Sequence, residues 1–346
     1  MTGVLRGGLI GCGFFARNHL FGWGDVDGAE IVAVCDLDRA KAERAAADFR
    51  IPAVYADAAT MFAAEKLDFV DMPTTMETHE ALVGLALAHR VPTIVQKPFG
   101  PDLDACRRMA AAAEAAGVPL MVHEDFRFQP LFRALRGLID DGEIGRPTFA
   151  RLSWRTAIDV YSNQPYLVDV ERFMIMDVGV HMLDLDRFLL GEATDLFCDT
   201  QQVKQGIAGE DAATILLRHE NGAHSVVDIS YASHRDPDPF PQTLGEIEGE
   251  LGSILIEPGE RLRVHARGAT RAIAVHDDGR AWTSEPWRQI QDSVVRTETH
   301  FIDCLKRGVE PETSARRSLG TYELVEAAYL SARTGRRIAP ARDLRQ

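Results

Sequence analysis

The stretch G-G-L-I-G-C-G-F-F-A-R-N-H-L, residues 7–20, decides how the amino-terminal part of the chain folds. Gly11, Gly13 and Ala16 occupy the three small-residue positions of a G-x-G-x-x-G/A pattern, and residues 4–10 before the pattern are mostly apolar. This order predicts a buried strand, a tight turn and a helix that packs closely on the strand. The first turn of such a helix presents unpaired N–H groups and a partial positive charge to phosphate groups. The stretch therefore predicts a dinucleotide site.

An acidic residue follows the second apolar segment, residues 31–35, and strengthens this prediction. Asp36 lies 25 positions after Gly11, where a dinucleotide fold needs a carboxylate to accept hydrogen bonds from the adenosine ribose. An acid there repels a 2′-phosphate, and neither Leu37 nor Asp38 offers a cation in its place. The sequence therefore predicts NAD and not NADP as the cofactor. The other interpretation is a structural glycine turn followed by a surface aspartate.

Composition narrows the function classes. The chain has 346 residues, of which 46% are hydrophobic and 26% charged, as expected for a globular protein with two domains. A net charge of -14 argues against nucleic acid or an anionic membrane as a partner, whereas a small neutral substrate remains possible. The five cysteines are widely separated, so we expect no zinc site, no disulfide framework and a reducing cytoplasmic location. From these residues we expect neither a secretion signal nor an apolar segment that spans a bilayer.

Short apolar segments alternate with helical segments up to residue 122. The expected strands are 53–55, 68–72, 93–95 and 119–122, and the expected helices are 39–49, 58–64, 78–89 and 103–116. Such alternation predicts a doubly wound parallel sheet of the Rossmann type, so residues 1–122 are expected to form the NAD-binding domain. The cofactor-binding residues we expect are Gly11, Gly13, Phe14, Phe15, Asp36, Pro73, Thr74, Gln96 and Lys97.

Residues 123–346 have a different pattern. Helices are expected at 131–139, 177–190, 297–306 and 318–331, and strands at 148–155, 212–219, 223–230, 245–249, 253–257 and 261–265. Asn221-Gly222 between two strands is a strong hairpin signal. Together these features predict an α+β domain on a large open, mostly antiparallel sheet, which binds substrate and forms a homo-oligomer, a dimer or tetramer, through the sheet. The last helices are expected to pack on the first domain.

Three prolines lie within the loop of residues 234–242. The segment from Pro237 to Pro241 cannot pair as a central strand and is expected to be a stiff connection. The alternative is that this loop closes on the substrate.

Two groups of residues carry candidate chemistry. Lys97 follows the strand at 93–95, where an ammonium group could stabilise negative charge on a substrate oxygen, although it could also be an ordinary solvated lysine. Asp177 and His181 are four residues apart, so on a helix the carboxylate can orient the imidazole, which can then accept a hydroxyl proton. The alternative is an ordinary ion pair at a helix start. We expect a structural role for Asp184.

Substrate hydroxyls require polar side chains near this chemistry. The candidates are His123, Glu124, Arg127, Arg155, Asp159, Tyr161 and Asn163, with Lys97, Asp177 and His181 completing the set. His123 and Arg155 are favoured for substrate binding, and about half of the remainder should form structural ion pairs or loop contacts. No histidine has a ligand partner at metal spacing, so no metal is expected.

Five separated motifs together resemble the glucose-fructose oxidoreductase, inositol dehydrogenase and MocA family. They are G-C-G-F-F-A, Q-K-P-F, D-V-G-V-H-M-L-D, E-I-E-G-E-L-G-S-I and A-A-Y-L-S-A-R-T-G, in order along almost the whole chain. The resemblance implies a two-domain oxidoreductase that acts on sugars or cyclitols, with Lys97, Asp177 and His181 as its catalytic residues. Gln96 stands where the family usually has Glu before the lysine.

A narrower resemblance is to the D-apiose dehydrogenase branch of that family. It depends on Q-K-P-F, on residues 121–130 (M-V-H-E-D-F-R-F-Q-P) and on residues 239–244 (P-F-P-Q-T-L). It implies oxidation of a branched aldose at its anomeric carbon to a lactone or aldonate. Asp125 replaces the asparagine expected there. The alternatives are a cyclitol dehydrogenase of the inositol type and an NAD-binding sensor without turnover.

Overall fold

The structure is a computed structural model that describes residues 3–162, 164–276 and 279–344, so Asn163 lies outside the described residues. The chain forms two compact units. The first comprises Met1–Asp125, Arg280–Thr283 and Ile290–Leu319, and the second comprises Phe126–Gly279, Ser284–Gln289 and Gly320–Gln346. The domain boundary at residue 122 stays a prediction.

The first unit is built on a six-stranded parallel sheet in the order β3-β2-β1-β4-β5-β6. Its strands are β1 (Leu5–Ile10), β2 (Ala29–Cys35), β3 (Ala53–Tyr55), β4 (Phe69–Met72), β5 (Thr93–Gln96) and β6 (Leu120–His123). This is the strand order of a dinucleotide-binding Rossmann sheet. The order reverses between β1 and β4, and ligands of such sheets bind beyond the carboxyl ends of the strands at that point.

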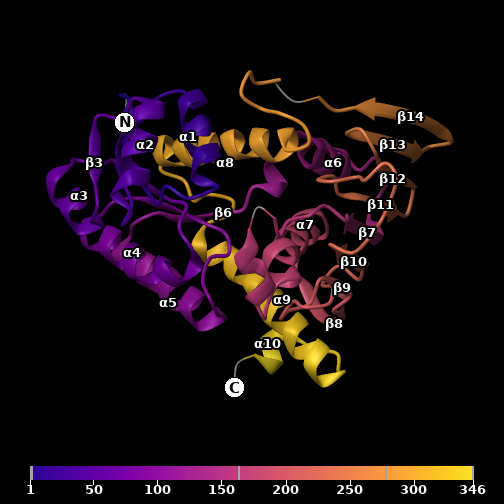
Figure 1. Cartoon of the computed structure of the whole chain (residues 1–346). Helices are drawn as coiled ribbons and strands as arrows, with labels where there is room; N and C mark the ends of the chain where they lie inside the picture. Colours follow the sequence, from indigo (N-terminus) through magenta and orange to yellow (C-terminus); the bar gives the residue numbers. More distant parts are fainter. Residues whose placement is uncertain (1–2, 163, 277–278, 345–346) are drawn as a thin grey trace. The chain divides into compact units, whose positions relative to one another are not determined.

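Helices cover this sheet on both faces. They are α1 (Ala16–Asp25), α2 (Arg39–Phe49), α3 (Ala58–Ala64), α4 (Met76–Ala88), α5 (Leu103–Ala116) and most of α8 (Arg288–Arg307). In Figure 1, α4 and α5 lie side by side on one side of the unit, and α1 and α8 lie on the other. Local signals define several ends, because the side chains of Asp38, Asp57 and Asp102 cap α2, α3 and α5.

The second unit is built on an eight-stranded sheet in the order β14-β13-β12-β11-β7-β10-β9-β8, which Figure 1 shows running from β14 at the top of the view to β8 at the bottom. The strands are β7 (Pro147–Arg155), β8 (Ala193–Gln201), β9 (Ala212–His219), β10 (His224–Ser230), β11 (Leu244–Gly249), β12 (Gly252–Glu257), β13 (Arg261–Ala266) and β14 (Ala269–Ala274). Every pairing is antiparallel except that of β7 with β10, which confirms the predicted mostly antiparallel sheet.

Alternating burial along the strands shows which face of this sheet is covered. In β9, Ile215 and Leu217 are buried, whereas Leu216 between them is exposed. The covering helices are α6 (Pro130–Asp140), α7 (Val180–Leu190) and the carboxyl-terminal part of α9 (Ala315–Thr334), with short turns η1 (Phe126–Phe128) and η2 (Pro165–Asp169) and a final helix α10 (Pro340–Asp343). The predicted hairpin at Asn221-Gly222 joins β9 to β10, with Gly222 at φ 86°.

Two predicted helices differ from the structure. The helix expected at 297–306 begins at Arg288, because Ile290, Val294 and Val295 already supply a buried face with helical spacing. The helix expected at 177–190 begins with a separate π-helical turn, η3 (Ile175–Gly179), which contains Asp177. Within the described residues, no helix is long and apolar enough to cross a membrane.

The proline-rich loop is tied to the end of β7. Asp238 accepts hydrogen bonds from Thr156 Oγ1 at 2.6 Å and from the backbone N–H of Ala157 at 2.9 Å. Trp154 Nε1 donates to the carbonyl oxygen of Pro241 at 2.9 Å. These contacts agree with a stiff connection, whereas closure of the loop on a substrate stays a prediction.

Candidate functional site

The glycine turn after β1 lies against the end of β4. Gly11 has φ +97°, a conformation that glycine adopts without strain. A Cβ added at Gly11 would lie 2.7 Å from Cγ2 of Thr74 and 3.1 Å from the carbonyl oxygen of Pro73. A side chain at position 11 would therefore separate the two strand ends. The turn brings together three of the residues predicted to contact the cofactor.

The Asp36 carboxylate is held by backbone donors on both sides. One oxygen accepts from the N–H of Cys12 at 2.7 Å, and the other accepts from the N–H of Asp38 at 2.8 Å. Asp36 is half-buried, so the carboxylate is fixed but remains accessible. Burial, with Asp36 adding to it, raises the pKa of the Cys12 thiol to about 12, so this thiol is neutral near pH 7. A fixed acid at this place is what recognition of ribose hydroxyls requires.

The start of α1 is open to an anion. No side chain caps its first turn, and that turn contains no acidic residue. A Cβ added at Gly13 would meet no atom within 4 Å, so this glycine is not needed to relieve crowding within the protein. Phe14 is 64% exposed and Phe15 is half-buried. Backbone N–H groups, space and a positive helix end together fit a pyrophosphate.

Gln96 is the last residue of β5, and Lys97 follows it. The backbone N–H of Lys97 donates to Gln96 Oε1 at 2.7 Å, and Gln96 is 8% exposed. The other end of the Gln96 amide, Nε2, lies 3.0 Å from Nε2 of His19. The structure thus connects Lys97 to a histidine of α1 that the sequence analysis did not assign to the site.

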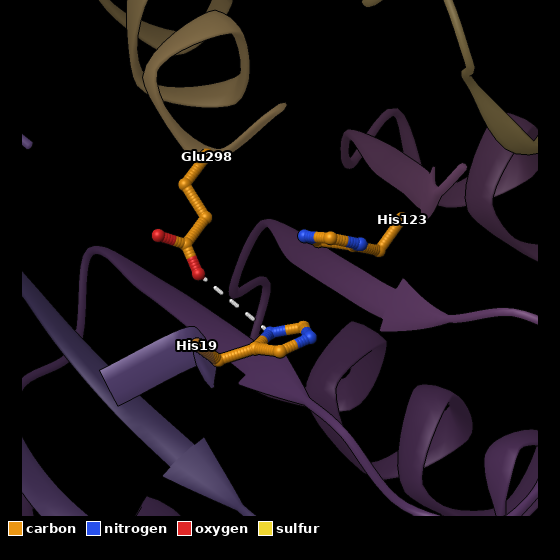
Figure 2. A group of neighbouring side chains, drawn as sticks. All are labelled: His19, His123 and Glu298. Carbon is orange, nitrogen blue, oxygen red and sulfur yellow. Dashed lines mark ion pairs between the residues drawn. The ribbon is translucent and has the colours of Figure 1, made fainter. Parts of the chain in front are cut away.

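His19 belongs to a buried polar cluster of the first unit. His19 Nδ1 lies 2.8 Å from Asp71 Oδ2, which also accepts from Trp23 Nε1 at 2.7 Å. Glu298 of α8 points its carboxyl group at His19, with Oε1 3.7 Å from Nδ1 (Figure 2). A charged residue in the otherwise apolar β4 is the signal that could have indicated this cluster from the sequence.

The same cluster offers three metal-ligand side chains. Ligand atoms of His19, His123 and Glu298 lie within 4.8 Å of one another. The two imidazole rings, however, lie one above the other (Figure 2). Their centroids are 4.3 Å apart, and the angle between their planes is 34°. A metal ion binds in the plane of an imidazole, so stacked rings do not direct their nitrogens at one ion. Both nitrogens of His19 also have hydrogen-bond partners. This arrangement forms a hydrogen-bond network and not a metal centre.

His123, which the sequence favours for substrate binding, lies at the end of β6. It pairs with Gln96 in the register of the sheet and is fully buried. Its ring covers one face of His19. A role in substrate binding stays a prediction.

Asp177 is anchored within the second unit by a tyrosine. Tyr231 donates its hydroxyl hydrogen to Asp177 Oδ2 at 2.9 Å. Burial and the Asp177 carboxylate raise the pKa of Tyr231 well above its usual value, so the phenol keeps its proton. Tyr231 itself stacks on Phe173, with ring centroids 5.4 Å apart. Tyr231 was not assigned to the site from the sequence, since no local pattern links it to a residue 54 positions away.

His181 is held by an aromatic stack. Its ring lies parallel to that of Phe126, with centroids 4.0 Å apart and planes 8° apart, and it is 6% exposed. The π-helical turn at Ile175–Gly179 leads into α7, so His181 follows Asp177 across the junction of the two elements. The stack fixes the plane of the imidazole.

Two further arginines form ion pairs within the second unit. Arg127 binds Asp184 through two hydrogen bonds of 2.7 and 2.6 Å, and Thr321 also donates to Asp184. This agrees with the structural role expected for Asp184. Arg155 donates to the buried Asp228 at 3.3 Å, beside Arg151. Arg155 therefore has a partner within its own sheet, and its contact with substrate stays a prediction.

Two other candidates, Asp159 and Tyr161, have local contacts within the second unit. Asp159 accepts hydrogen bonds from the backbone N–H groups of Tyr161 and Ser162 and so closes its own loop. The ammonium group of Lys204 lies 4.8 Å from the centre of the Tyr161 ring. Glu124 is buried. These contacts indicate structural roles for Asp159 and Tyr161, as expected for about half of the set.

A Rossmann sheet with an open glycine turn and a fixed acid, followed by a large mixed sheet, defines the class of two-unit dinucleotide-dependent oxidoreductases. Comparison with known proteins agrees with this. Residues 5–124 match the oxidoreductase family with an NAD-binding Rossmann fold, and residues 132–255 match the GFO/IDH/MocA C-terminal domain. The chain belongs to the GFO/IDH/MocA oxidoreductase family, and its first unit binds NAD, which confirms both predictions.

Several relatives are similar along nearly the whole chain. Two are named D-apiose dehydrogenase. The protein of Paraburkholderia graminis is 52% identical over 333 residues, which cover 96% of this chain and 89% of the relative. The protein of Rhizobium rhizogenes is 46% identical over 334 residues, which cover 96% of this chain and 97% of the relative. A crystal structure of an oxidoreductase from Agrobacterium radiobacter, in complex with NAD+, L-tartaric acid and magnesium, has a TM-score of 0.96 and 45% identity, and covers 98% of this chain and 99% of that one.

Proposed function

We propose that this protein is an NAD-dependent sugar dehydrogenase that oxidises an aldose at C1 to the lactone or aldonate, with D-apiose as the best candidate. The observation that carries this proposal is the 52% identity, over 96% of the chain, with a relative named D-apiose dehydrogenase. The sequence of residues 121–130 and 239–244 supports the same branch of the family.

The residues of the first unit fit the cofactor. The open start of α1 and the turn at Gly11 and Gly13 would hold the pyrophosphate, and the fixed carboxylate of Asp36 would hold the ribose. When bound, NAD supplies the acceptor for a hydride. Pro73, Thr74, Gln96 and Lys97 lie at the ends of β4 and β5, on the same edge of the sheet.

Oxidation at C1 breaks a C–H bond and an O–H bond of the sugar. In the proposed reaction His181 accepts the hydroxyl proton as the hydride leaves C1. Lys97 donates a hydrogen bond to the same oxygen and stabilises the negative charge that develops on it. Asp177 orients His181, and His123 and Arg155 bind other hydroxyl groups of the sugar. The electron pair of the C–H bond leaves with the hydride, and the product is a lactone that water can open to the aldonate.

Local contacts of the second unit support a fixed acid and base. The hydrogen bond from Tyr231 limits the rotation of the Asp177 carboxylate, and the stack with Phe126 limits that of the His181 ring. Groups held in one orientation lose less entropy when a reaction reaches its transition state.

The test is NADH formation over a panel of D-apiose, other aldoses and cyclitols such as myo-inositol, each with NAD and with NADP. We expect the highest kcat/KM with D-apiose and NAD, and a lactone or aldonate as the product. A preference for myo-inositol would assign the protein to the cyclitol dehydrogenases. Tight NAD binding without turnover of any member of the panel would favour an NAD-binding sensor and contradict the proposal.

A further inference from the structure

A continuous chain of hydrogen bonds connects Asp71 to the backbone of Lys97 within the first unit. Asp71 Oδ2 lies 2.8 Å from His19 Nδ1, and His19 Nε2 lies 3.0 Å from Gln96 Nε2. Gln96 Oε1 accepts from the backbone N–H of Lys97 at 2.7 Å. The chain joins the middle of β4, the first helix and the end of β5.

The direction of every hydrogen bond in this chain follows from its last member. The backbone N–H of Lys97 can only donate, so the oxygen of the Gln96 amide must face it. The NH2 group of Gln96 then faces His19, and Nε2 of His19 must be the acceptor. Nδ1 therefore carries the hydrogen and donates it to Asp71. This assigns His19 as the neutral imidazole with its proton on Nδ1.

The surroundings of His19 hold its ring in place. The ring is fully buried, and His123 stacks on one face of it (Figure 2). Trp23 Nε1 donates to the same oxygen of Asp71 at 2.7 Å. A ring enclosed in this way and bonded through both nitrogens has one orientation.

Glu298 completes the enclosure from α8. A Cβ at Gly22 would collide with its carboxyl group, so that carboxyl group packs directly on the backbone of α1. Burial, together with the charge of Asp71, raises the pKa of Glu298 well above its usual value. Asp25 raises it too, whereas Arg280 lowers it. Burial therefore favours the neutral form of the Glu298 carboxyl group.

We propose that His19 is a positioning residue for Lys97: held by Asp71, it fixes the Gln96 amide, which fixes the backbone at Lys97 and so the direction in which the lysine leaves β5. This rests on the proposed role of Lys97 in sugar oxidation. His19 and Asp71 act here through Gln96, and neither is assigned a contact with substrate.

The proton assignment is tested by NMR of the full-length protein labelled with 15N-histidine, in the absence of substrate. The signals of His19 are identified by their loss in His19→Asn. We expect one protonated and one bare nitrogen, with the hydrogen on Nδ1. In Gln96→Glu, an oxygen faces Nε2 where the amide NH2 was, so both nitrogens should be protonated. A hydrogen on Nε2 in the unmodified protein would overturn the proposal.

The positioning role is tested by kinetics. We expect His19→Ala to lower kcat about 10- to 100-fold, because small displacements of a reacting group reduce the rate by such factors, with the Kd of NAD within about threefold. Gln96→Glu keeps an acceptor for the N–H of Lys97, whereas Gln96→Leu removes the acceptor. The decrease in kcat should therefore be smaller in Gln96→Glu than in Gln96→Leu. His219→Ala, which removes a buried histidine of the second unit, is the control for lost stability and should retain kcat per folded molecule.

Three results would contradict the positioning role. The first is an unchanged kcat in His19→Ala. The second is an equal decrease in kcat in Gln96→Glu and Gln96→Leu. The third is a decrease in kcat in His19→Ala that the unfolded fraction of the variant explains completely. If the unmodified protein oxidises no sugar, the proposed function fails. The NMR measurement still tests the direction of the hydrogen bonds that connect Asp71 to Lys97.

Discussion

Asp36 is the residue on which the predicted preference for NAD over NADP depends. Its two oxygens accept from the backbone N–H groups of Cys12 and Asp38, so the carboxylate has a fixed position next to the predicted ribose site. A carboxylate in this position pairs with ribose hydroxyls and repels a 2′-phosphate. We therefore expect the preference for NAD over NADP to depend on this one carboxylate.

We predict that Asp36→Ala raises the Kd of NAD about tenfold or more, because the substitution removes hydrogen bonds to a charged group. It should also reduce the preference for NAD over NADP. Calorimetric titration with each dinucleotide measures both effects. Asp102→Ala, which removes the cap of α5, is a matched control and should leave the preference unchanged. An unaltered ratio of the two Kd values in Asp36→Ala would refute the ribose role.

Lys97 is the second residue with a specific prediction. Lys97→Ala should lower kcat by about 10²- to 10³-fold, because removal of a donor to a developing oxyanion typically costs this much. The Kd of NAD should change little. Stopped-flow measurement of NADH formation with the best sugar of the panel gives kcat, and the exposed Lys66→Ala serves as the control. If Lys97→Ala turns over at the unmodified rate, the lysine has no catalytic role.

Between elements, side-chain pairs join segments that are far apart in the sequence. Arg127 of η1 and Asp184 of α7 form a two-point ion pair, and the carboxylate of Asp184 is almost fully buried. Arg127 also lies 5.2 Å from the centre of the Phe188 ring, on the same helix as Asp184. The pair therefore fixes η1, which carries Phe126, against the helix that carries His181.

We predict that Asp184→Ala lowers the free energy of unfolding by about 3–5 kcal/mol, because it breaks a two-point ion pair whose side chains are only 11% and 2% exposed. Urea denaturation followed by circular dichroism measures this change. Glu43→Ala breaks an exposed ion pair of α2 with Arg39 and should have little effect. A stability loss no larger than that of Glu43→Ala would show that the buried pair contributes nothing.

Element positions could mostly be predicted from local patterns. The segments 39–49 and 103–116 are the helices α2 and α5 with the predicted limits, because an aspartate before each and a residue with positive φ after each mark the ends. The start of α8 was placed nine residues too late, since the charged and β-branched residues after Arg288 weaken its helical signal. The π-helical turn at Ile175–Gly179 has no sequence signal that distinguishes it from an α-helix.

At the scale of the whole molecule, the eight-stranded sheet is the surface through which the sequence predicts that an oligomer forms. Phe197 of β8 and Leu216 of β9 are paired across the strands, and each is 37% exposed. Apolar side chains on an exposed sheet face favour contact with another chain. These two residues are a direct means of testing that face.

We predict that the double variant Phe197→Glu and Leu216→Glu dissociates the oligomer, because it places like charges in the contact. Sedimentation velocity before and after the change measures the mass in solution. Val309→Glu, at an exposed apolar residue of the first unit, is the control. An unmodified protein that sediments as a monomer, or a variant that keeps its oligomer, would contradict the role of this face.

By itself, the sequence of this protein determined the order of most strands and helices, the glycine turn and the acid at position 36, because these depend on residues close together in the chain. It also indicated Lys97, Asp177 and His181 as candidates. Only the tertiary structure decided that Tyr231 holds Asp177 and that His19, Asp71 and Gln96 form a chain ending at Lys97. Such contacts depend on how strands and helices pack across long separations, and the periodicity of a single segment contains no record of its distant partners.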